Sequence, residues 1–218
     1  MLSREATLSG PRGQHVGRVA CVTDAKAPRA DAVRNRARLL EAAEAEFAQH
    51  GMDVSVADIA ARARVGKGTV FRHFATKEEL LAAVVLSRLD VLIADGERLA
   101  ETSPAESALF DFMSLAASQQ QDELSVLTNV DGVNDLLEGA QARLFGLMER
   151  LALQAQIAGA LRDDVTGEDV ALLICAPGHV AGFAPRADPE LWRRYLAIIV
   201  DGLRPEGARP LATPPRNT

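Results

Sequence analysis

The sequence predicts an all-α protein of about nine helices, in which a three-helix unit precedes a larger helical body. Ala, Leu, Glu and Arg, which favour helices, dominate almost every long segment of the 218 residues. Aromatic residues make up only 4% of the chain, and apolar residues recur at intervals of three or four. A chain of this length has room for one or two domains with buried cores.

The two ends of the chain lack helical periodicity. Residues 1–30 mix Gly, Pro, Ser and Arg, and we expect a disordered basic arm there, with Pro28 interrupting any helix that runs onward. Residues 205–218 are rich in proline and are expected to form a disordered tail. The apolar run Val19–Val22 is too short for a secretory signal, and no stretch approaches the ~20 apolar residues that span a bilayer. We therefore expect a cytoplasmic protein without membrane contact.

The first predicted helix opens a domain over residues 31–80. From Asp31 onward, charged residues fill one face and apolar residues recur at helical spacing on the other. Gly51 is able to take the left-handed conformation that closes a helix. The apolar positions are Val33, Ala37, Leu40, Ala43 and Phe47.

Two short helices follow within the same domain. The segment Ser55–Asp58 resembles a capping box, which satisfies free amides at a helix start. Arg64-Val65-Gly66 breaks this helix, and a third helix is expected over Lys67–Phe74. Val70 and Phe74 lie one turn apart on its inner face, so the three helices share one core.

The helical body is expected over residues 81–204. Thr76–Glu79 resembles a second capping box, and the helix that it opens is expected to reach about Gly96–Ala100. Cys21 and Cys175 are isolated, which argues against a disulfide. The remaining helices are expected over residues 104–118, 122–129, 133–157, 167–182 and 189–203.

Two short helices joined by a tight turn form a helix-turn-helix, which places an exposed face in the DNA major groove. With Val70 and Phe74 in the core, the outward residues of the third helix offer cations and donors for base edges and phosphates. Lys77 begins the next helix, where free amides also favour a phosphate. The predicted DNA-binding residues are Ser55, Arg64, Lys67, Gly68, Thr69, Phe71, Arg72, His73 and Lys77.

The net charge of -6 is divided unevenly along the chain. Residues 1–30 carry five basic and two acidic groups, and residues 31–80 carry eight of each. Residues 81–218 carry eleven basic and twenty acidic groups. Such a chain orients itself on a polyanion with its acidic body turned away. Whether the basic arm also touches the minor groove is left open.

Three segments resemble the signature of the TetR family of bacterial regulators. They are Ile59-Ala60, Val65-Gly66-Lys67-Gly68-Thr69-Val70-Phe71-Arg72-His73-Phe74 and Lys77-Glu78-Glu79-Leu80. The resemblance covers about residues 33–82 and crosses three helices in order. It implies a homodimer, a divergent C-terminal ligand domain and, usually, repression that a small molecule relieves.

Three residues depart from the family pattern. Phe71 stands where Tyr is usual, so a hydroxyl that would bond a phosphate is missing. Arg64 stands where the turn usually has Gly, and a left-handed backbone there would cost ~1 kcal/mol more for Arg. Ala75 replaces a common Pro.

The helical body is predicted to sense a ligand and to dimerise. Apolar cavities between bundle helices are where small ligands usually bind. Pro177 is expected to kink a helix next to His179, unless that helix ends near Ala176. The last two helices are expected to pair with their two-fold mates. The candidate ligand-binding residues are Phe110, Met113, Leu127, Phe145, Met148, Cys175, His179 and Phe183.

The sequence thus predicts a sequence-specific transcription regulator, a repressor released from a near-palindromic operator by a small-molecule effector. One alternative is a regulator that activates or that answers to no small molecule, and another is a helical enzyme with an inherited DNA-binding module. No catalytic residue, metal or cofactor is expected. The four histidines are scattered, and Gly66–Thr69 lacks the Lys-Ser or Lys-Thr pair of a phosphate loop.

Overall fold

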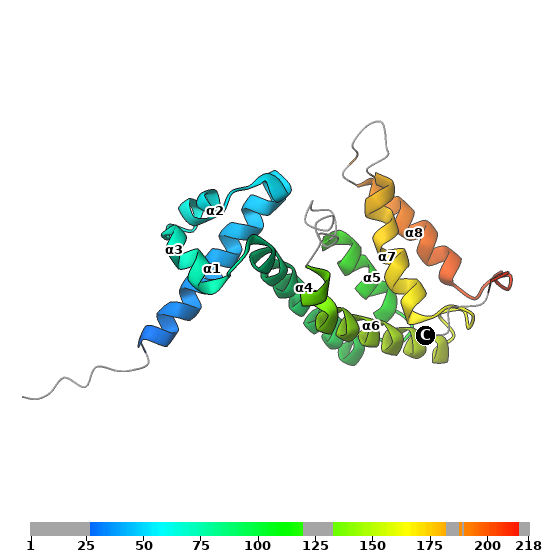
Figure 1. Cartoon of the computed structure of the whole chain (residues 1–218). Helices are drawn as coiled ribbons and strands as arrows, with labels where there is room; N and C mark the ends of the chain where they lie inside the picture. The colour runs from blue at the N-terminus through cyan, green and yellow to red at the C-terminus, as the bar shows by residue number, and fades with distance from the viewer. Residues whose placement is uncertain (1–26, 120–132, 182–187, 189, 214–218) are drawn as a thin grey trace, which may run out of the picture.

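The computed structural model describes residues 27–119, 133–181, 188 and 190–213, and their regular elements are all helical (Figure 1). This confirms the all-α prediction, with eight α-helices in the described residues against about nine expected. The helix expected over 122–129 lies outside the described residues. The elements are α1 (Ala27–His50), the 3-10 turn η1 (Gly51–Asp53), α2 (Val56–Arg62), α3 (Lys67–His73), α4 (Lys77–Thr102), α5 (Ala108–Gln119), α6 (Asn134–Ile157), α7 (Gly167–Ala181) and α8 (Leu191–Leu203).

Helices α1, α2 and α3 form an N-terminal bundle that stands apart from α5–α8, with α4 running between them (Figure 1). Phe47, Ile59, Val70 and Phe74 are buried together in its core. The helix α1 begins at Ala27 rather than at Asp31, because proline is tolerated in a first turn, where no N–H donor is needed.

The N-terminal turns of α1 project beyond the bundle (Figure 1). Val33 and Ala37, expected on the buried face, are therefore exposed, whereas Leu39, Ala43 and Phe47 are buried farther along the helix. Burial on α1 thus begins only where α2 and α4 pack against the helix.

Helices α4 and α6 each belong to two hydrophobic cores. Leu80, Leu81 and Val84 of α4 pack into the core of the N-terminal bundle, and Ile93 packs into the core of the body. The start of α6 contributes Leu137 to the first core, and the buried residues Leu147, Met148 and Leu151 belong to the second. These two helices join the bundle to the body.

The ends of α5 and α7 differ from the predicted ones. The helix α5 begins at Ala108, because the Pro104 carbonyl first closes a turn by accepting the N–H groups of Ser107 and Ala108, both at 3.0 Å. The helix α7 continues through the buried Pro177 to Ala181, so the alternative of an end near Ala176 is wrong. No described helix is long and apolar enough to cross a membrane.

Residues 205–213, expected to be disordered, are instead held against the loop between α6 and α7. Arg162 Nη2 donates to the Arg209 carbonyl (2.6 Å), and the Leu211 N–H donates to Asp164 Oδ2 (3.0 Å). Arg162 Nη2 also donates to Asp164 Oδ2 (2.9 Å). The Arg162 guanidinium and then the Leu211 N–H hold the pKa of Asp164 well below its ordinary value.

Replacing Gly96 by alanine is expected to destabilise the fold. A Cβ atom at Gly96 would lie 2.5 Å from Leu147 Cδ2 and 2.6 Å from Phe112 Cε2, so α4, α5 and α6 would have to move apart. Overpacking of this kind costs about 1–3 kcal/mol, which chemical denaturation measures. Gly146→Ala is the control: no atom lies within 4 Å of its Cβ position, so it is expected to stabilise by about 0.5–1 kcal/mol. Equal effects of both substitutions would contradict the close packing at Gly96.

Asp164→Asn is expected to lower the melting temperature at neutral pH. Because the folded pKa of Asp164 is depressed, its stabilising contribution is complete above the unfolded pKa of about 3.9. That contribution is lost as pH falls through the folded pKa, so the difference from wild type should narrow below about pH 4. Melting curves from pH 7 to pH 3 measure this, with the exposed Asp163→Asn as control. A difference that does not depend on pH would contradict the role of the charged pair.

Candidate nucleic-acid interface

The start of α2 is fixed by the predicted capping box. The Ser55 hydroxyl accepts the Asp58 N–H (3.2 Å), and the Asp58 carboxylate accepts the Ser55 N–H (3.3 Å). Hydrogen bonds from the Ser55 side chain and backbone hold the pKa of Asp58 below its ordinary value. Ser55 is exposed, but its hydroxyl is engaged in the cap. A DNA contact by this hydroxyl therefore has to compete with the cap.

The turn between α2 and α3 carries a strained residue. Arg64 has φ 56°, the one positive φ outside glycine among the described residues. Backbone hydrogen bonds on both sides fix the turn, from Arg64 N to Ala61 O (3.1 Å) and from Val65 N to Ala60 O (2.9 Å). The sequence predicts a cost at Arg64 if the backbone there is left-handed, and φ 56° shows that it is. This conformation costs an arginine roughly 1–2 kcal/mol.

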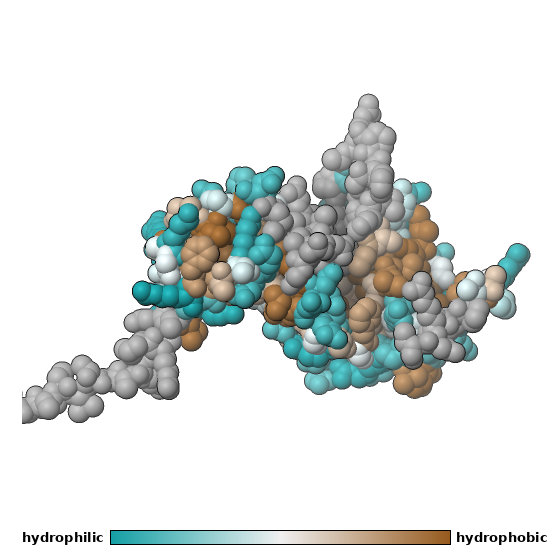
Figure 2. Space-filling model, in the orientation of Figure 1, coloured by the Kyte–Doolittle hydropathy of each residue, from teal (hydrophilic) through white to brown (hydrophobic). Residues whose placement is uncertain are grey.

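Helix α3 is anchored by two buried side chains, with Val70 1% and Phe74 5% exposed. Lys67 and Arg72 are exposed on its outer side, as expected. Phe71 is 50% exposed, which separates it from the core. The other two predicted positions that lack a charge are an open glycine, Gly68, and the half-buried Thr69, and His73 is also half-buried. Figure 2 shows hydrophobic residues among hydrophilic ones on the surface of this bundle.

Lys77 is the first residue of α4 and is half-buried. Thr76 precedes it as N-cap, and its hydroxyl accepts the Glu79 N–H at 3.1 Å. The Glu79 carboxylate accepts the N–H of Ala75 at 2.7 Å rather than that of Thr76. The second capping box is therefore displaced by one residue, and it ties the end of α3 to the start of α4.

The predicted ligand-binding residues that the structure describes lie partly in the body core and partly at the surface. Met113 and Met148 are buried in the body core, and Phe110 packs against that core with the Arg204 guanidinium 5.2 Å from its ring centroid. Phe145 and Cys175 instead lie exposed on α6 and α7, because these faces have no helix packed over them among the described residues. Leu127, Phe183 and the side chain of His179 lie outside the described residues.

No group of three or more His, Cys, Asp or Glu residues in the described part of the chain is arranged to hold a metal ion. The candidate site rests instead on the exposed Lys67, Phe71 and Arg72 of α3.

The comparisons with known proteins agree with this geometry. Residues 39–84 match the family of bacterial regulatory proteins of the tetR type, and residues 104–205 match the C-terminal domain of SbtR-like transcriptional regulators. A crystal structure of a TetR transcription regulatory protein from Mycobacterium vanbaalenii is 32% identical, with TM-score 0.60, over 81% of this chain and 99% of that chain. The chain belongs to the TetR family.

Further relatives match either a short segment of this chain or most of it at lower identity. A helix-turn-helix transcriptional repressor of Mycobacterium tuberculosis is 50% identical over 50 residues, which is 22% of this chain and 27% of the repressor. A regulator from Saccharomonospora viridis, solved in complex with choline, is 20% identical with TM-score 0.64 over 78% of this chain and 96% of that one. The chain thus shares a stretch of 50 residues at 50% identity with the repressor, and it shares the fold over most of its length with the solved structures.

Phe71→Tyr is expected to strengthen DNA binding severalfold. The ring is already exposed on the outer side of α3, so a phenolic hydroxyl there is able to donate to a phosphate without disturbing the core. Fluorescence anisotropy with a labelled duplex measures the gain, and Phe71→Ala is expected to weaken binding. If Tyr and Ala give the same affinity as Phe, this ring does not contact DNA.

Proposed function

We propose that the chain is a transcription regulator that binds operator DNA through α3 and represses until a small-molecule effector releases it. The observation that carries this proposal is the helix α3, which is anchored by the buried Val70 and by the buried Phe74 at its C-cap while Lys67 and Arg72 remain exposed. Family membership supports it, as does the similarity of a 50-residue stretch of this chain to a bacterial repressor. Such a regulator acts in the cytoplasm, where its DNA lies.

The chemistry of α3 suits a major groove. Lys67 opens the helix beside Gly66 and Gly68, and no atom lies within 4 Å of a Cβ position at either glycine. This leaves room for a base edge or a phosphate close to the backbone. Arg72, one turn later, adds a guanidinium suited to phosphate or to guanine. The acidic residues of the body are distant from α3 in the sequence. The net charge of -6 therefore does not describe the charge near α3 and does not by itself oppose DNA binding there.

A homodimer through α7 and α8 completes the proposal. Leu172 of α7 and Ile198 of α8 are 58% and 57% exposed, and the two helices pack against each other. Apolar residues that form a contiguous exposed patch mark interaction sites. Figure 2 shows apolar atoms at the surface over these helices. Pairing of this face with a second copy would bury them and would place two α3 helices on a near-palindromic operator.

Coupling between effector and DNA would run through α4 and α6. Arg88 Nε of α4 donates to Glu44 of α1 at 2.7 Å, and Arg143 Nη2 of α6 donates to Asp90 of α4 at 2.8 Å. A ligand that binds one arrangement of the body better would shift α4 and with it the spacing of the two α3 helices. A coupling of ~1–3 kcal/mol corresponds to about 5- to 150-fold in operator affinity.

The small-molecule effector is supported by the choline complex of a protein of the same fold. The alternative regulator without an effector would show no thermal shift with any compound of a ligand library. An enzyme with an inherited module would keep its function when α3 loses its cations.

The proposal is tested by selecting bound genomic fragments with the purified full-length chain. Lys67→Ala and Arg72→Ala should each weaken binding to the selected fragment about 10- to 100-fold, because each removes a charged contact worth ~1.5–3 kcal/mol. The matched control is Arg150→Ala, an exposed arginine on α6.

Footprints on the selected fragment should show two related half-sites, and sedimentation should give the mass of a dimer. If the chain selects no DNA, or if both α3 variants bind as tightly as wild type, the proposed function is wrong. If the protein is a monomer at micromolar concentration, only the proposed dimer is wrong, and the proposed DNA binding is unaffected.

A further inference from the structure

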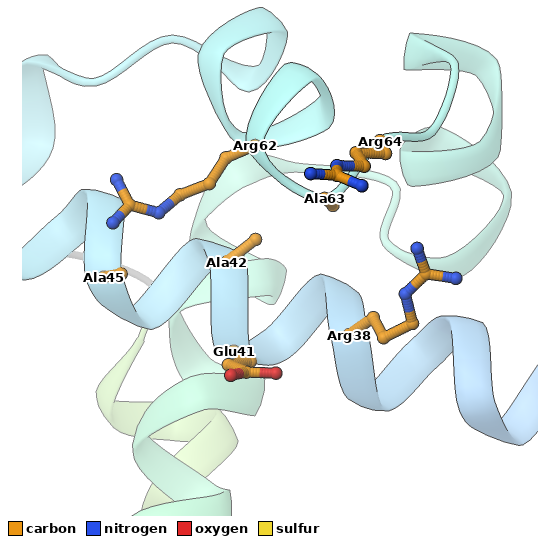
Figure 3. Close-up of a pocket in the computed structure, with 7 residues that line it drawn as sticks. All are labelled: Arg38, Glu41, Ala42, Ala45, Arg62, Ala63 and Arg64. Atoms are coloured by element: carbon orange, nitrogen blue, oxygen red, sulfur yellow. The ribbon is translucent and has the colours of Figure 1, made fainter.

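A basic pocket of about 310 Å³ lies beside α3, between α1 and the turn that follows α2 (Figure 3). Its charged lining consists of Arg38 and Glu41 of α1, Arg62 at the end of α2, and Arg64 of the turn, and the rest is alanine. None of these four residues belongs to α3. The pocket is therefore separate from the outer face of α3.

Two of the three arginines have no partner within the described part of the chain. Arg62 Nη1 is held by Glu46 Oε1 at 2.8 Å, and in Figure 3 its guanidinium points away from Arg64. Arg38 and Arg64 are exposed and make no hydrogen bond or ion pair with any described residue. Figure 3 shows the Arg38 side chain rising from α1 toward the segment that carries Arg64, while Glu41 lies on the lower side of α1.

The strained backbone at Arg64 indicates that this arginine has a role in binding. A left-handed φ of 56° suits glycine, and strained positions of this kind cluster at ligand contacts. The turn has no need of a cation for its own hydrogen bonds, because these are made by the backbone of Arg64 and Val65. The guanidinium of Arg64 is thus unexplained by the fold.

The charges continue along α1. Arg34, Arg36 and Arg38 occupy its N-terminal half, where Asp31 is the one acidic residue, whereas Glu41, Glu44 and Glu46 follow later. The Arg36 guanidinium lies 4.9 Å from the ring centroid of Phe74, which places this basic half of α1 alongside the end of α3. A duplex held by α3 would meet these cations next.

We propose that Arg38 and Arg64 together bind one backbone phosphate of the DNA duplex, outside the contacts of α3. This site rests on the proposed function, since it requires that α3 hold the DNA. Guanidinium groups suit a phosphodiester, and such a contact adds affinity and register without reading the sequence.

The test compares full-length variants on the selected genomic fragment and on an unrelated duplex of equal length. Arg64→Gly should raise the melting temperature, because the left-handed strain is relieved, and should weaken DNA binding about tenfold at low salt. Arg38→Gln should weaken binding similarly without that stabilisation. Both should weaken the two duplexes by the same factor, and Arg150→Ala should change neither.

Because one phosphate is shared, the double variant should bind little worse than either single one. Its slope of log affinity against log salt should be smaller by about 0.9 than that of wild type. If Arg64→Gly stabilises the fold but affinity and salt slope stay at wild-type values, the phosphate site is wrong. The proposed function then stands, provided that Lys67→Ala still weakens binding.

The alternative occupant of the pocket is free inorganic phosphate rather than a phosphate of the DNA backbone. Inorganic phosphate replaces chloride at equal ionic strength, and the melting temperatures of wild type and the double variant are compared. If phosphate stabilises only the wild type while both bind DNA equally, the pocket serves a free anion and the assignment to DNA is overturned. Loss of DNA affinity in the double variant supports the assignment.

Discussion

The structure depends on the sharing of α4 and α6 between two hydrophobic cores. Neither core is complete without them: residues of α4 and α6 are buried both against the N-terminal bundle and inside the body. The helices meet closely at Gly96, where the absence of a side chain leaves room for Leu147 and Phe112. Because packed cores resist continuous deformation, displacement of one helix in the body has to be transmitted to the bundle.

Local features of the sequence predicted the bundle well. The spacing of Val70 and Phe74 predicted the position of α3. The Ser55–Asp58 cap was predictable because it depends on only four neighbouring residues. Positions that depend on distant packing were harder. Val33 has the right period but lies where α1 has no cover, and Pro104 suits a helix start yet closes a turn first. The exposed Phe145 shows the same difficulty, since helical periodicity does not tell which face a neighbouring helix will cover.

The parts of the candidate site that depend on neighbouring residues could be predicted from the sequence, and the parts that depend on the fold could not. The outward residues of α3 follow from its two buried ones, whereas Arg38 gave no signal of its own among the charged residues of α1. Only the fold brings it to the same pocket as Arg64, 26 positions away in the chain. Arg64 itself was noticeable in the sequence because it departs from the glycine usual in TetR proteins, and the structure adds the conformation that makes the departure costly.

The tail beyond α8 limits what that helix is able to do. The backbone at Arg209 and Leu211 is hydrogen-bonded to Arg162 and Asp164. The chain that follows α8 is therefore bound to the loop that leads into α7. A helix end normally frays and exchanges its amide hydrogens quickly. Here the Arg162 N–H also donates to the Leu203 carbonyl in the last turn of α8 (3.1 Å), so we expect α7 and α8 to open together as a single cooperative unit. The two helices would then meet a second copy as one preformed surface, with little entropy left to lose on pairing.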